Sequence, residues 1–490
     1  MADVEKKETV IIGAGPGGYV AAFRASELGQ KVTLIEKSDT LGGVCLNVGC
    51  VPSKALIAAG HRLQEANDAS TYGITTQPAT IDFAKTQEWK QKKVVDRMTS
   101  GVKMLLNKHK VEVIHGEAVL DSDTQLRVMP TGPQQFMSAD TGTTIQFDNL
   151  IIASGSHPIE IPGFKFDGRV VDSTGGLNLP EIPKEFVVIG GGYVGTELAG
   201  AYANLGAHVT IIEGLDSILN GFSKDMVSLV VKNLKKKGVD IHTSAKAISS
   251  SQDDNSVSVT YEEDGKQTTI KADYCMVTVG RRPNTDDLGL EYTKVKLDDH
   301  GIVQTDIQGR TDSEHIFAIG DIASGPALAH KAFFQGKVAA GAISGKNTAN
   351  DYVGVPAVCF SDPEIAVVGM TQAQAKDKDI EVSTSKFPFA GNARAVSLDQ
   401  ADGFVRLIFT KDDKTIVGGE MLAVLQTLAV HRDEICNTFT HHYTNGPLEG
   451  SNNKIKVIKR TGFGYRNFFR FRLRVLFAFR VHTKRALITK

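Results

Sequence analysis

Two glycine-rich turns, each set between a short apolar stretch and a helical pattern, constrain the fold of this chain more than any other feature. The first is Gly13-Ala14-Gly15-Pro16-Gly17-Gly18, and the second is Gly190-Gly191-Gly192-Tyr193-Val194-Gly195. After each helical pattern comes a second apolar stretch that ends in an acid, Glu36 or Glu213. Strand, glycines, helix, strand and acid in this order are typical of a dinucleotide-binding βαβ unit. The sequence therefore predicts an α/β chain with two Rossmann-like domains and two bound dinucleotides.

The glycines of such a unit have separate duties. The first permits the tight turn, the second lets the backbone approach a pyrophosphate, and the third lets the helix pack on the strand. The helix N-terminus stabilises the phosphate charge. We expect these duties to fall on Gly13, Gly15 and Gly18 in the first unit, and on Gly190, Gly192 and Gly195 in the second.

The acid that ends each unit contacts the adenosine ribose. Glu36 can accept hydrogen bonds from ribose hydroxyls in the first unit. A carboxylate at Glu213 suits a free 2′-hydroxyl and repels a 2′-phosphate, and no arginine follows it at once. The second unit is therefore predicted to bind NAD rather than NADP.

The segment from Gly42 to Lys54 holds two of the five cysteines, Cys45 and Cys50. If a helix begins near Cys45, a loosened first turn brings the two sulfurs together. A thiol near a helix N-terminus, with Lys54 on the next turn, has a lowered pKa. The pair is interpreted as a redox-active dithiol; a zinc half-site and two buried structural cysteines are the alternatives. Zinc needs four ligands, and the other cysteines supply no second pair: Cys275, Cys359 and Cys436.

The sequence of this segment is Gly-Gly-Val-Cys-Leu-Asn-Val-Gly-Cys-Val-Pro-Ser-Lys. It resembles the active-site disulfide segment of the flavoprotein disulfide reductases, most closely that of the dihydrolipoamide dehydrogenase branch. The resemblance implies FAD and NAD as cofactors. It assigns Cys45 as the interchange thiol that reacts with a reduced lipoyl group, and Cys50 as the thiol beside the flavin. It pairs Lys54 with Glu197 near the flavin, and it places Tyr193 over the nicotinamide site.

The same resemblance assigns further residues to the cofactors. Asp321 is expected on the flavin ribityl chain and the turn from Ala327 to His330 beside the ring. The expected cofactor contacts also include Lys54, Gly116, Ser154, Gly155, Ser156, Gly280, Leu328 and Ala329. No metal site is expected.

The resemblance also divides the chain into domains and names partners. It implies an FAD-binding domain over 1–150 and 281–350, an NAD-binding domain over 151–280 and an incomplete dimerisation domain over 351–420. The implied partners are a second copy of the chain and a lipoyl-bearing acyltransferase of a 2-oxo acid dehydrogenase complex. No signal peptide and no apolar run long enough to span a bilayer is apparent, so we expect a cytoplasmic protein without a membrane partner.

The C-terminal 70 residues differ from the rest in charge. Residues 421–490 contain 13 Lys+Arg and 3 Asp+Glu, so the other 420 residues contain 55−13 = 42 basic and 56−3 = 53 acidic ones. The stretch 441–454 resembles the end of a DDE-type insertion-sequence transposase, with Glu449 at that family's last catalytic carboxylate. We interpret the tail as a fusion; an unusual native extension is the alternative. Its basic and aromatic residues are interpreted as a remnant rather than a nucleic-acid contact.

The family resemblance ends before the C-terminal segment that carries the family's general base, a histidine. A His-Pro segment followed by a glutamate is absent from the tail, and His157-Pro158 lies in the wrong domain. The sequence therefore predicts a dihydrolipoamide dehydrogenase-type enzyme whose lipoamide turnover is impaired. An inactive fusion product and a DNA-binding transposition protein are the alternatives; the net charge of −1 gives no support to nucleic-acid binding by the whole chain.

Overall fold

The computed structural model describes residues 4–75, 77–131 and 142–423, and the chain divides into two compact units, Met1–Val367 and Val368–Lys490. Each unit is described by itself. Glu449 lies outside the described residues, as do His431, His441 and His442, none of which is followed by proline.

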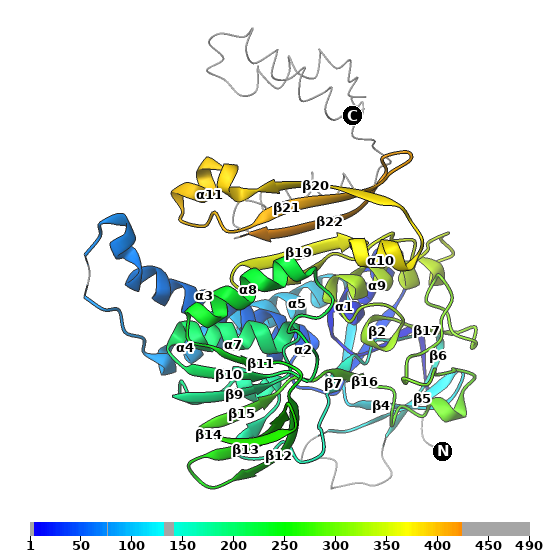
Figure 1. Ribbon diagram of the computed structural model, residues 1–490. Coiled ribbons are helices and arrows are strands. Elements are labelled where there is room, and N and C mark those ends of the chain that lie inside the picture. Colours follow the sequence, from blue (N-terminus) through cyan, green and yellow to red (C-terminus); the bar gives the residue numbers. More distant parts are fainter. Residues whose placement is uncertain (1–3, 76, 132–141, 424–490) are drawn as a thin grey trace. The chain divides into compact units, whose positions relative to one another are not determined.

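The first unit contains a seven-stranded sheet in the order β3-β2-β1-β6-β5-β4, with β17 paired to β6 (Figure 1). The pairs β1–β2, β2–β3, β1–β6 and β6–β17 are parallel, whereas β4–β5 and β5–β6 are antiparallel. Buried parallel strands read as unbroken apolar runs, as in Val-Ile-Ile at the end of β1. The strands are β1 (Val4–Ile12), β2 (Val32–Glu36), β3 (Glu112–His115), β4 (Glu117–Ser122), β5 (Gln125–Met129), β6 (Thr143–Ile152) and β17 (Ile316–Ala318).

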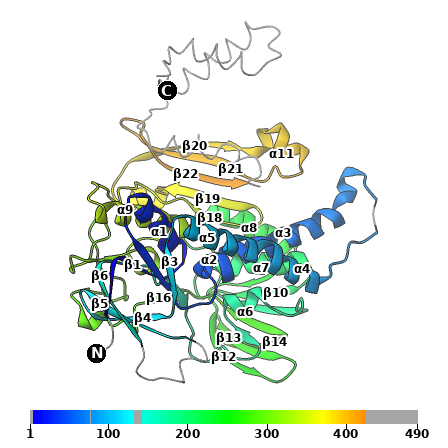
Figure 2. The ribbon, with the colours of Figure 1, turned by 180° about the vertical axis from the view of Figure 1, so that it is seen from behind.

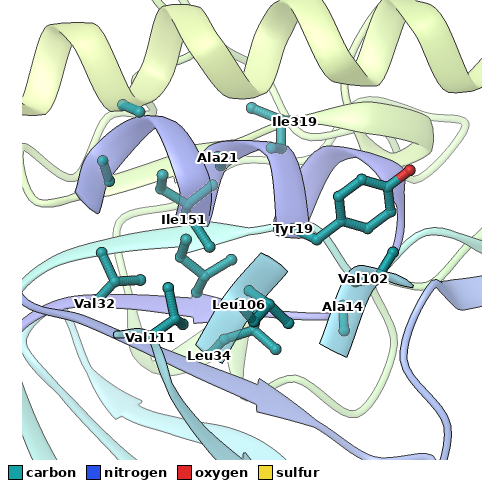
Figure 3. Close-up of a cluster of buried hydrophobic side chains, with 14 of the residues drawn as sticks. Ala14, Tyr19, Ala21, Val32, Leu34, Val102, Leu106, Val111, Ile151 and Ile319 are labelled. Atoms are coloured by element: carbon teal, nitrogen blue, oxygen red, sulfur yellow. The ribbon is translucent and has the colours of Figure 1, made fainter. Parts of the chain in front are cut away.

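Helices α1 (Pro16–Glu27), α5 (Asp96–Lys108) and α9 (Ala329–Ile343) pack around this sheet. Figure 3 shows Ala21 and Ile319 in the layer next to α9, and Leu34, Leu106 and Ile151 in the layer below α1. Helices α1 and α9 lie close together because glycine stands at their crossing. A Cβ at Gly336 would lie 2.7 Å from the carbonyl oxygen of Gly17.

A second, five-stranded parallel sheet has the order β11-β10-β9-β15-β8. Helices α7 (Tyr193–Leu205) and α8 (Lys224–Lys236) connect its strands, and an antiparallel sheet of three strands, β12-β13-β14, shares a core with it. The strands are β8 (Val170–Val171), β9 (Glu185–Ile189), β10 (His208–Ile212), β11 (Asp240–His242), β12 (Lys246–Gln252), β13 (Val257–Glu263), β14 (Lys266–Ala272) and β15 (Tyr274–Val277).

Between the two sheets the chain crosses through a short antiparallel pair, β7 (Ser156–Pro158) with β16 (Arg281–Pro283). A short helix, α6 (Ser173–Leu177), begins at Asp172, whose side chain accepts from the Gly175 N–H. The 3₁₀ turns η4 (Leu290–Tyr292) and η5 (Gly320–Ile322) complete this region.

The sequence predicts helical structure over 55–110 with a polar loop near Thr71 to Thr80, and the observed helical region is interrupted there. It contains α2 (Gly43–Val48), α3 (Cys50–Asn67), the 3₁₀ turn η1 (Ala69–Tyr72), α4 (Phe83–Trp89) and a π-helical turn η2 (Lys90–Val95) before α5. Helix α3 packs beside α7, as Figure 2 shows.

The stretch Gly43–Asn67 is long and apolar enough by composition to cross a membrane, with a mean hydropathy of 1.3 over 18 residues. The expectation that no such run exists was therefore wrong. Core helices of globular proteins meet the same criterion, and 39% of that window is buried within the fold.

Near the end of the first unit, β18 (Ala357–Cys359) pairs antiparallel with β19 (Glu364–Gly369), which runs across the boundary between the units. The second unit holds the antiparallel ladder β20 (Val382–Pro388), β21 (Phe404–Thr410) and β22 (Ile416–Ala423). The sequence predicts antiparallel strands here at 357–360, 366–369, 381–387, 404–409 and 415–420, and the five observed strands coincide with them to within a few residues. The sequence reading omitted the short helices α10 (Gln372–Asp377) and α11 (Ala393–Ser397) and the 3₁₀ turn η6 (Phe389–Gly391). Helix α10 had a signal, because Thr371 and Gln374 form a capping box.

Candidate functional site

The two cysteines of the segment from Gly42 to Lys54 lie on two successive helices. Cys45 is in α2, and Cys50 is the first residue of α3. Gly49 separates them with φ −141° and ψ −113°, and a Cβ there would lie 3.0 Å from the carbonyl oxygen of Val44. The expectation of one helix with a loosened first turn was therefore wrong, because the chain breaks completely at Gly49 and starts a new helix.

Both cysteines are thiols in this structure, and their side chains share a hydrogen bond. The hydrogen bond from Cys45 lowers the pKa of Cys50 to about 7, against the opposing effect of burial, and the Lys54 ammonium lowers it further. The same hydrogen bond, burial and the Cys50 charge raise the pKa of Cys45. One thiol therefore stabilises the other as a thiolate. The described residues contain no group of three or more metal-ligating side chains, which gives the zinc alternative no support.

Lys54 and Glu197 form the contact that the family resemblance implies. The Lys54 ammonium donates to Glu197 Oε2 at 2.8 Å, and the backbone N–H of Phe360 donates to Glu197 Oε1 at 2.9 Å. The ammonium also lies 4.3 Å from the centre of the Phe360 ring. Glu197 is 7% exposed. A buried carboxylate with a partner on each oxygen holds the cation next to the Cys50 thiol.

The first glycine turn has the shape that a pyrophosphate needs. A Cβ at Gly13 would lie 2.4 Å from the Ala153 carbonyl oxygen, and one at Gly18 would lie 1.8 Å from that of Gly13. Gly15 is different, because a Cβ there would have the Gly43 Cα as its nearest neighbour, at 3.9 Å. Among the described residues no side chain caps the N-terminus of α1. Its N–H groups are thus open toward the space beside Gly15, which fits a bound phosphate.

Glu36 accepts from two backbone N–H groups, from Ala14 at 2.7 Å through Oε2 and from Ser38 at 2.9 Å through Oε1. The Gly116 N–H donates to the Glu36 carbonyl oxygen at 2.9 Å. A carboxylate oxygen has a second lone pair. The carboxylate is therefore oriented by the backbone and can still accept from ribose hydroxyls.

The second glycine turn repeats the first. A Cβ at Gly195 would lie 1.9 Å from the Gly190 carbonyl oxygen, and Gly192 has open space beside it. Glu213 accepts from the N–H of Gly191 at 2.6 Å and from that of Leu215 at 2.8 Å. A cavity of about 520 Å³ opens here, lined by residues that include Gly190, Gly192, Glu213, Lys246 and Gly280. A ribose and pyrophosphate fit this donor set.

Tyr193 follows this turn at the start of α7 and is 41% exposed. Its ring packs against Phe222 with 5.1 Å between the ring centres. Partial burial raises the pKa of the Tyr193 hydroxyl.

Asp321 lies in η5 and accepts from the Ser156 hydroxyl at 2.6 Å. The Arg281 guanidinium donates to the Ser156 Oγ at 2.8 Å and to its carbonyl oxygen at 2.5 Å. Burial lowers the pKa of Arg281, while Asp321 and the nearby Cys50 oppose the shift. The Ser156 hydroxyl thus joins the Asp321 turn to β7, and Arg281 holds Ser156 in place.

The neighbouring residues Ser154 and Gly155 are held by Asn284. The Ser154 hydroxyl donates to the Asn284 carbonyl oxygen at 2.7 Å. The Asn284 side-chain amide donates to the Ser154 carbonyl oxygen at 2.8 Å, and the Asn284 backbone N–H donates to the Gly155 carbonyl oxygen at 2.9 Å. Gly155 has φ +75°, which favours glycine. The turn at Ser154 and Gly155 is therefore fixed by the residue that directly follows β16.

The turn from Ala327 to His330 leads into α9. Leu328 is its N-cap residue, Ala329 starts the helix, and Ala327 is exposed. The exposed His330 ring makes a 2.6 Å hydrogen bond from Nε2 to the Pro356 carbonyl oxygen.

The sequence reading missed three residues of the site, Phe360, Arg281 and Asn284. Arg281 and Asn284 had a signal, because Arg-Arg-Pro-Asn directly follows Gly280, a few residues after β15. Phe360 had none, since its partner Glu197 is 163 residues away in the chain.

Comparison with known families gives three matches. The pyridine nucleotide-disulphide oxidoreductase profile matches residues 7–336, and the dimerisation domain of the same family matches residues 355–438. A transposase profile matches residues 404–475. The last two overlap over 404–438, a range that contains the boundary at residue 420 expected from the sequence.

Named relatives and solved structures agree with the family profiles. The dihydrolipoyl dehydrogenases of Geobacillus stearothermophilus and Bacillus subtilis are each 54% identical over 415 residues, which is 86% of their length and 85% and 84% of this chain. LpdA from Mycobacterium tuberculosis has a TM-score of 0.81 at 25% identity, covering 98% of this chain and all of that one. The HOCl-induced flavoprotein disulfide reductase RclA from Escherichia coli shares the fold, with a TM-score of 0.76 at 24% identity over 94% of this chain and 97% of its own. With its paired cysteines, its two glycine turns and the match over residues 7–336, the chain belongs to the pyridine nucleotide-disulphide oxidoreductase family.

Proposed function

We propose that this protein is a dihydrolipoyl dehydrogenase that passes electrons from a dithiol, through the Cys45–Cys50 pair and FAD, to NAD. The observation that carries the proposal is the thiol pair itself. Cys50 has a pKa of about 7, accepts a hydrogen bond from Cys45, and lies within the field of the Lys54 ammonium at the start of α3.

The sulfur chemistry follows from that difference in pKa. When the pair is oxidised, one thiolate of the substrate dithiol attacks the Cys45 sulfur, the Cys45–Cys50 bond breaks, and Cys50 leaves as the thiolate. The second substrate thiol then attacks the mixed disulfide, which releases the cyclic disulfide product and leaves a proton on Cys45. A low pKa makes Cys50 the better leaving group, and the raised pKa of Cys45 suits the sulfur that ends as a thiol.

Lys54 has two tasks in this scheme. Its charge stabilises the thiolate at Cys50, and its hydrogen bond to Glu197 keeps the ammonium at a constant position. Since Glu197 belongs to α7, the redox helix α3 is attached to the helix that starts at the second glycine turn.

FAD and NAD are the cofactors of this family of enzymes. When bound, FAD would supply a two-electron acceptor for the dithiol and a hydride donor for NAD. We assign FAD to the first glycine turn with Glu36, Ser154, Gly155, Ser156, Asp321 and the turn 327–330. We assign NAD to the second glycine turn with Tyr193, Glu213 and Gly280.

The proposed reaction has a gap. Removal of the proton from the substrate dithiol needs a general base, and the tail contains no His-Pro segment followed by glutamate. A positioned base contributes ~10²–10⁴-fold in rate. We therefore expect transfer from NADH through the flavin to an artificial acceptor to survive better than dihydrolipoamide oxidation.

The test measures both reactions on the purified full-length protein, after confirmation that it is yellow and dimeric. The matched control replaces residues 421–490 with the C-terminal segment of the Geobacillus stearothermophilus relative. The replacement should raise dihydrolipoamide oxidation by ~10²-fold or more and leave acceptor reduction within about 2-fold. Full dihydrolipoamide oxidation by the unaltered protein refutes the claim that it lacks a general base. A colourless protein without acceptor activity refutes the proposed function.

The domains, partners and location are part of the proposal. FAD binds over 1–150 and 281–350, NAD over 151–280, and residues 351–420 form the beginning of the dimerisation domain. The partners are a second copy of this chain and a lipoyl-bearing acyltransferase of a 2-oxo acid dehydrogenase complex in the cytoplasm. Co-sedimentation with the acyltransferase core of such a complex tests the second partner.

A second candidate is an inactive fusion product, which the overlap of the transposase and dimerisation profiles over 404–438 favours. Size-exclusion chromatography and the flavin spectrum separate the two. A monomer without a long-wavelength absorption band on partial reduction supports the inactive product. Salt-dependent DNA binding by the full chain supports a function for the basic tail, and no binding at low salt removes that possibility.

A further inference from the structure

Lys331 is a buried lysine for which the proposed reaction has no use. It lies in the first turn of α9 and is 1% exposed. Its three N–H donors are shared among four carbonyl oxygens, those of Gly320 and Ala323 at 3.0 Å, Ser324 at 3.1 Å and Gly325 at 3.3 Å. All four carbonyls belong to one short loop. The chain therefore wraps this loop around a single cation.

The same loop carries Asp321. Gly320 has φ +76° and Gly325 has φ +99°, and these left-handed conformations at both ends turn the carbonyls toward the ammonium. One turn further along α9, the Gln335 side chain accepts from the Gly320 N–H at 2.9 Å. Helix α9 thus holds the Asp321 loop by a cation on its carbonyls and by an amide oxygen on its first N–H.

The charge of Lys331 is balanced mainly by dipoles. Among the described residues no carboxylate lies within ion-pair distance of its ammonium. Burial lowers the pKa of Lys331 to about 8, and the negative charge of Asp321 opposes that shift. The ammonium is therefore protonated at neutral pH, and the negative charge of Asp321 favours this protonated form.

We propose that Lys331 is a positioning residue of the FAD site: its ammonium gathers the carbonyls of residues 320–325 and so fixes the loop that presents Asp321 to the cofactor. The inference rests on the proposed function, which places FAD beside Asp321. The competing interpretation is that Lys331 stabilises the fold in general, with no particular effect on the cofactor.

The chain contains a matched control, Lys90. It is also 1% exposed, burial also lowers its pKa to about 8, and its ammonium donates to the Leu177 carbonyl oxygen and to Asn178 Oδ1. Neither partner belongs to the residues assigned to FAD. The two lysines therefore share burial and hydrogen bonding and differ in the loop that they hold.

The experiment compares full-length Lys331→Met and Lys90→Met with the wild type. FAD is removed, and the dissociation constant of added FAD is measured by flavin fluorescence, together with the melting temperature without FAD. Both variants should melt at lower temperature. Lys331→Met should bind FAD about 10-fold more weakly or worse, because the loop carbonyls lose their donor, whereas Lys90→Met should stay within about 2-fold of the wild type.

Each result has a consequence. Equal weakening in the two variants, or wild-type affinity in Lys331→Met, overturns the positioning role and leaves the proposed function intact. A wild-type protein that binds no FAD overturns the proposed function and the inference with it.

A measurement on the wild type covers the case in which Lys331→Met does not fold. Reductive methylation is followed by peptide mass spectrometry with and without FAD. If the loop bound to the Lys331 ammonium binds FAD more tightly than the open loop, then bound FAD must stabilise the contact between loop and ammonium by the same factor. FAD should therefore slow methylation of Lys331 several-fold and leave the rate at Lys90 unchanged; equal rates at Lys331 in the two states overturn the inference.

Discussion

Glu197 accepts from the Lys54 ammonium at 2.8 Å with one carboxylate oxygen and from the Phe360 N–H at 2.9 Å with the other. Glu197→Gln replaces one acceptor of a buried carboxylate by a donor, so one of its two half-buried partners loses its hydrogen bond. We expect the free energy of unfolding to fall by about 1–3 kcal/mol. The negative charge of Glu197 raises the pKa of Cys50, so this variant should also lower that pKa further below its ordinary range. Urea unfolding and pH-dependent alkylation measure the two effects.

Glu88→Gln is the control for this variant. Glu88 accepts from Lys92 at 2.6 Å, but both side chains are exposed, and solvent screening leaves such a pair with little effect on stability. A stability loss as large in Glu88→Gln as in Glu197→Gln contradicts the importance of burial at Glu197.

Alkylation should distinguish the two cysteines of the reduced protein. The thiolate is the reactive form, so the rate at Cys50 should rise with pH and level off above its pKa of about 7, while Cys45 reacts only at higher pH. Cys45→Ala removes the largest cause of the shift, and the midpoint for Cys50 should move up toward the ordinary value of ~8.5. Iodoacetamide rates read by peptide mass spectrometry check this. An unchanged midpoint in Cys45→Ala contradicts the hydrogen bond between the two thiols.

Nucleotide preference should depend on Glu213. Glu213→Ser removes the carboxylate that the Gly191 and Leu215 N–H groups orient, and it removes the charge that repels a 2′-phosphate. Lys246 lines the same cavity as Glu213. Without the Glu213 carboxylate, the Lys246 ammonium can attract the 2′-phosphate of NADPH. NADH binding should weaken about 10-fold while NADPH binding improves. Titration of nucleotide fluorescence measures both, and Glu213→Ser combined with Lys246→Met should lose the gain for NADPH. An unaltered ratio of the two affinities contradicts the assignment.

Two glycines of α7 should respond in opposite ways to alanine. A Cβ at Gly195 would lie 1.9 Å from the Gly190 carbonyl oxygen, so Gly195→Ala must displace the glycine turn. At Gly200 the nearest atom to a Cβ is the Leu234 Cδ2 at 3.7 Å, and alanine is the better residue in a helix by ~0.5–1 kcal/mol. Gly195→Ala should lose NADH affinity while the protein stays yellow, and Gly200→Ala should bind NADH normally. NADH titration and the absorption spectrum test the pair, and normal NADH binding by Gly195→Ala refutes the tight turn.

The local features of the site could be predicted from the sequence. The glycine turns, their acids and the cysteine segment each occupy a few consecutive residues, and the backbone around them follows from those residues alone. The family resemblance added the contact between Lys54 and Glu197, which the structure contains. The break at Gly49 was missed because a helix of six residues directly before another helix has the same periodicity as one long helix.

The contacts that complete the site could not be predicted in this way. Phe360 meets Glu197 across 163 residues, and Arg281 meets Ser156 across 125. Which distant strands and loops lie side by side depends on the packing of two sheets, and apolar periodicity does not encode that order. Lys331 shows the same limit, because nothing in its neighbours distinguishes a buried lysine from an exposed one at the start of an amphipathic helix.

Helix α7 begins at the second glycine turn and carries Glu197 about one turn later, where the carboxylate meets the redox helix. Any tilt of this helix that accompanies the arrival of a nucleotide moves Glu197 and the ammonium that it holds. The affinity for the nicotinamide cofactor and the acidity of the thiol then become mutually dependent, so each redox state of the sulfur pair has its own preference for NAD or NADH.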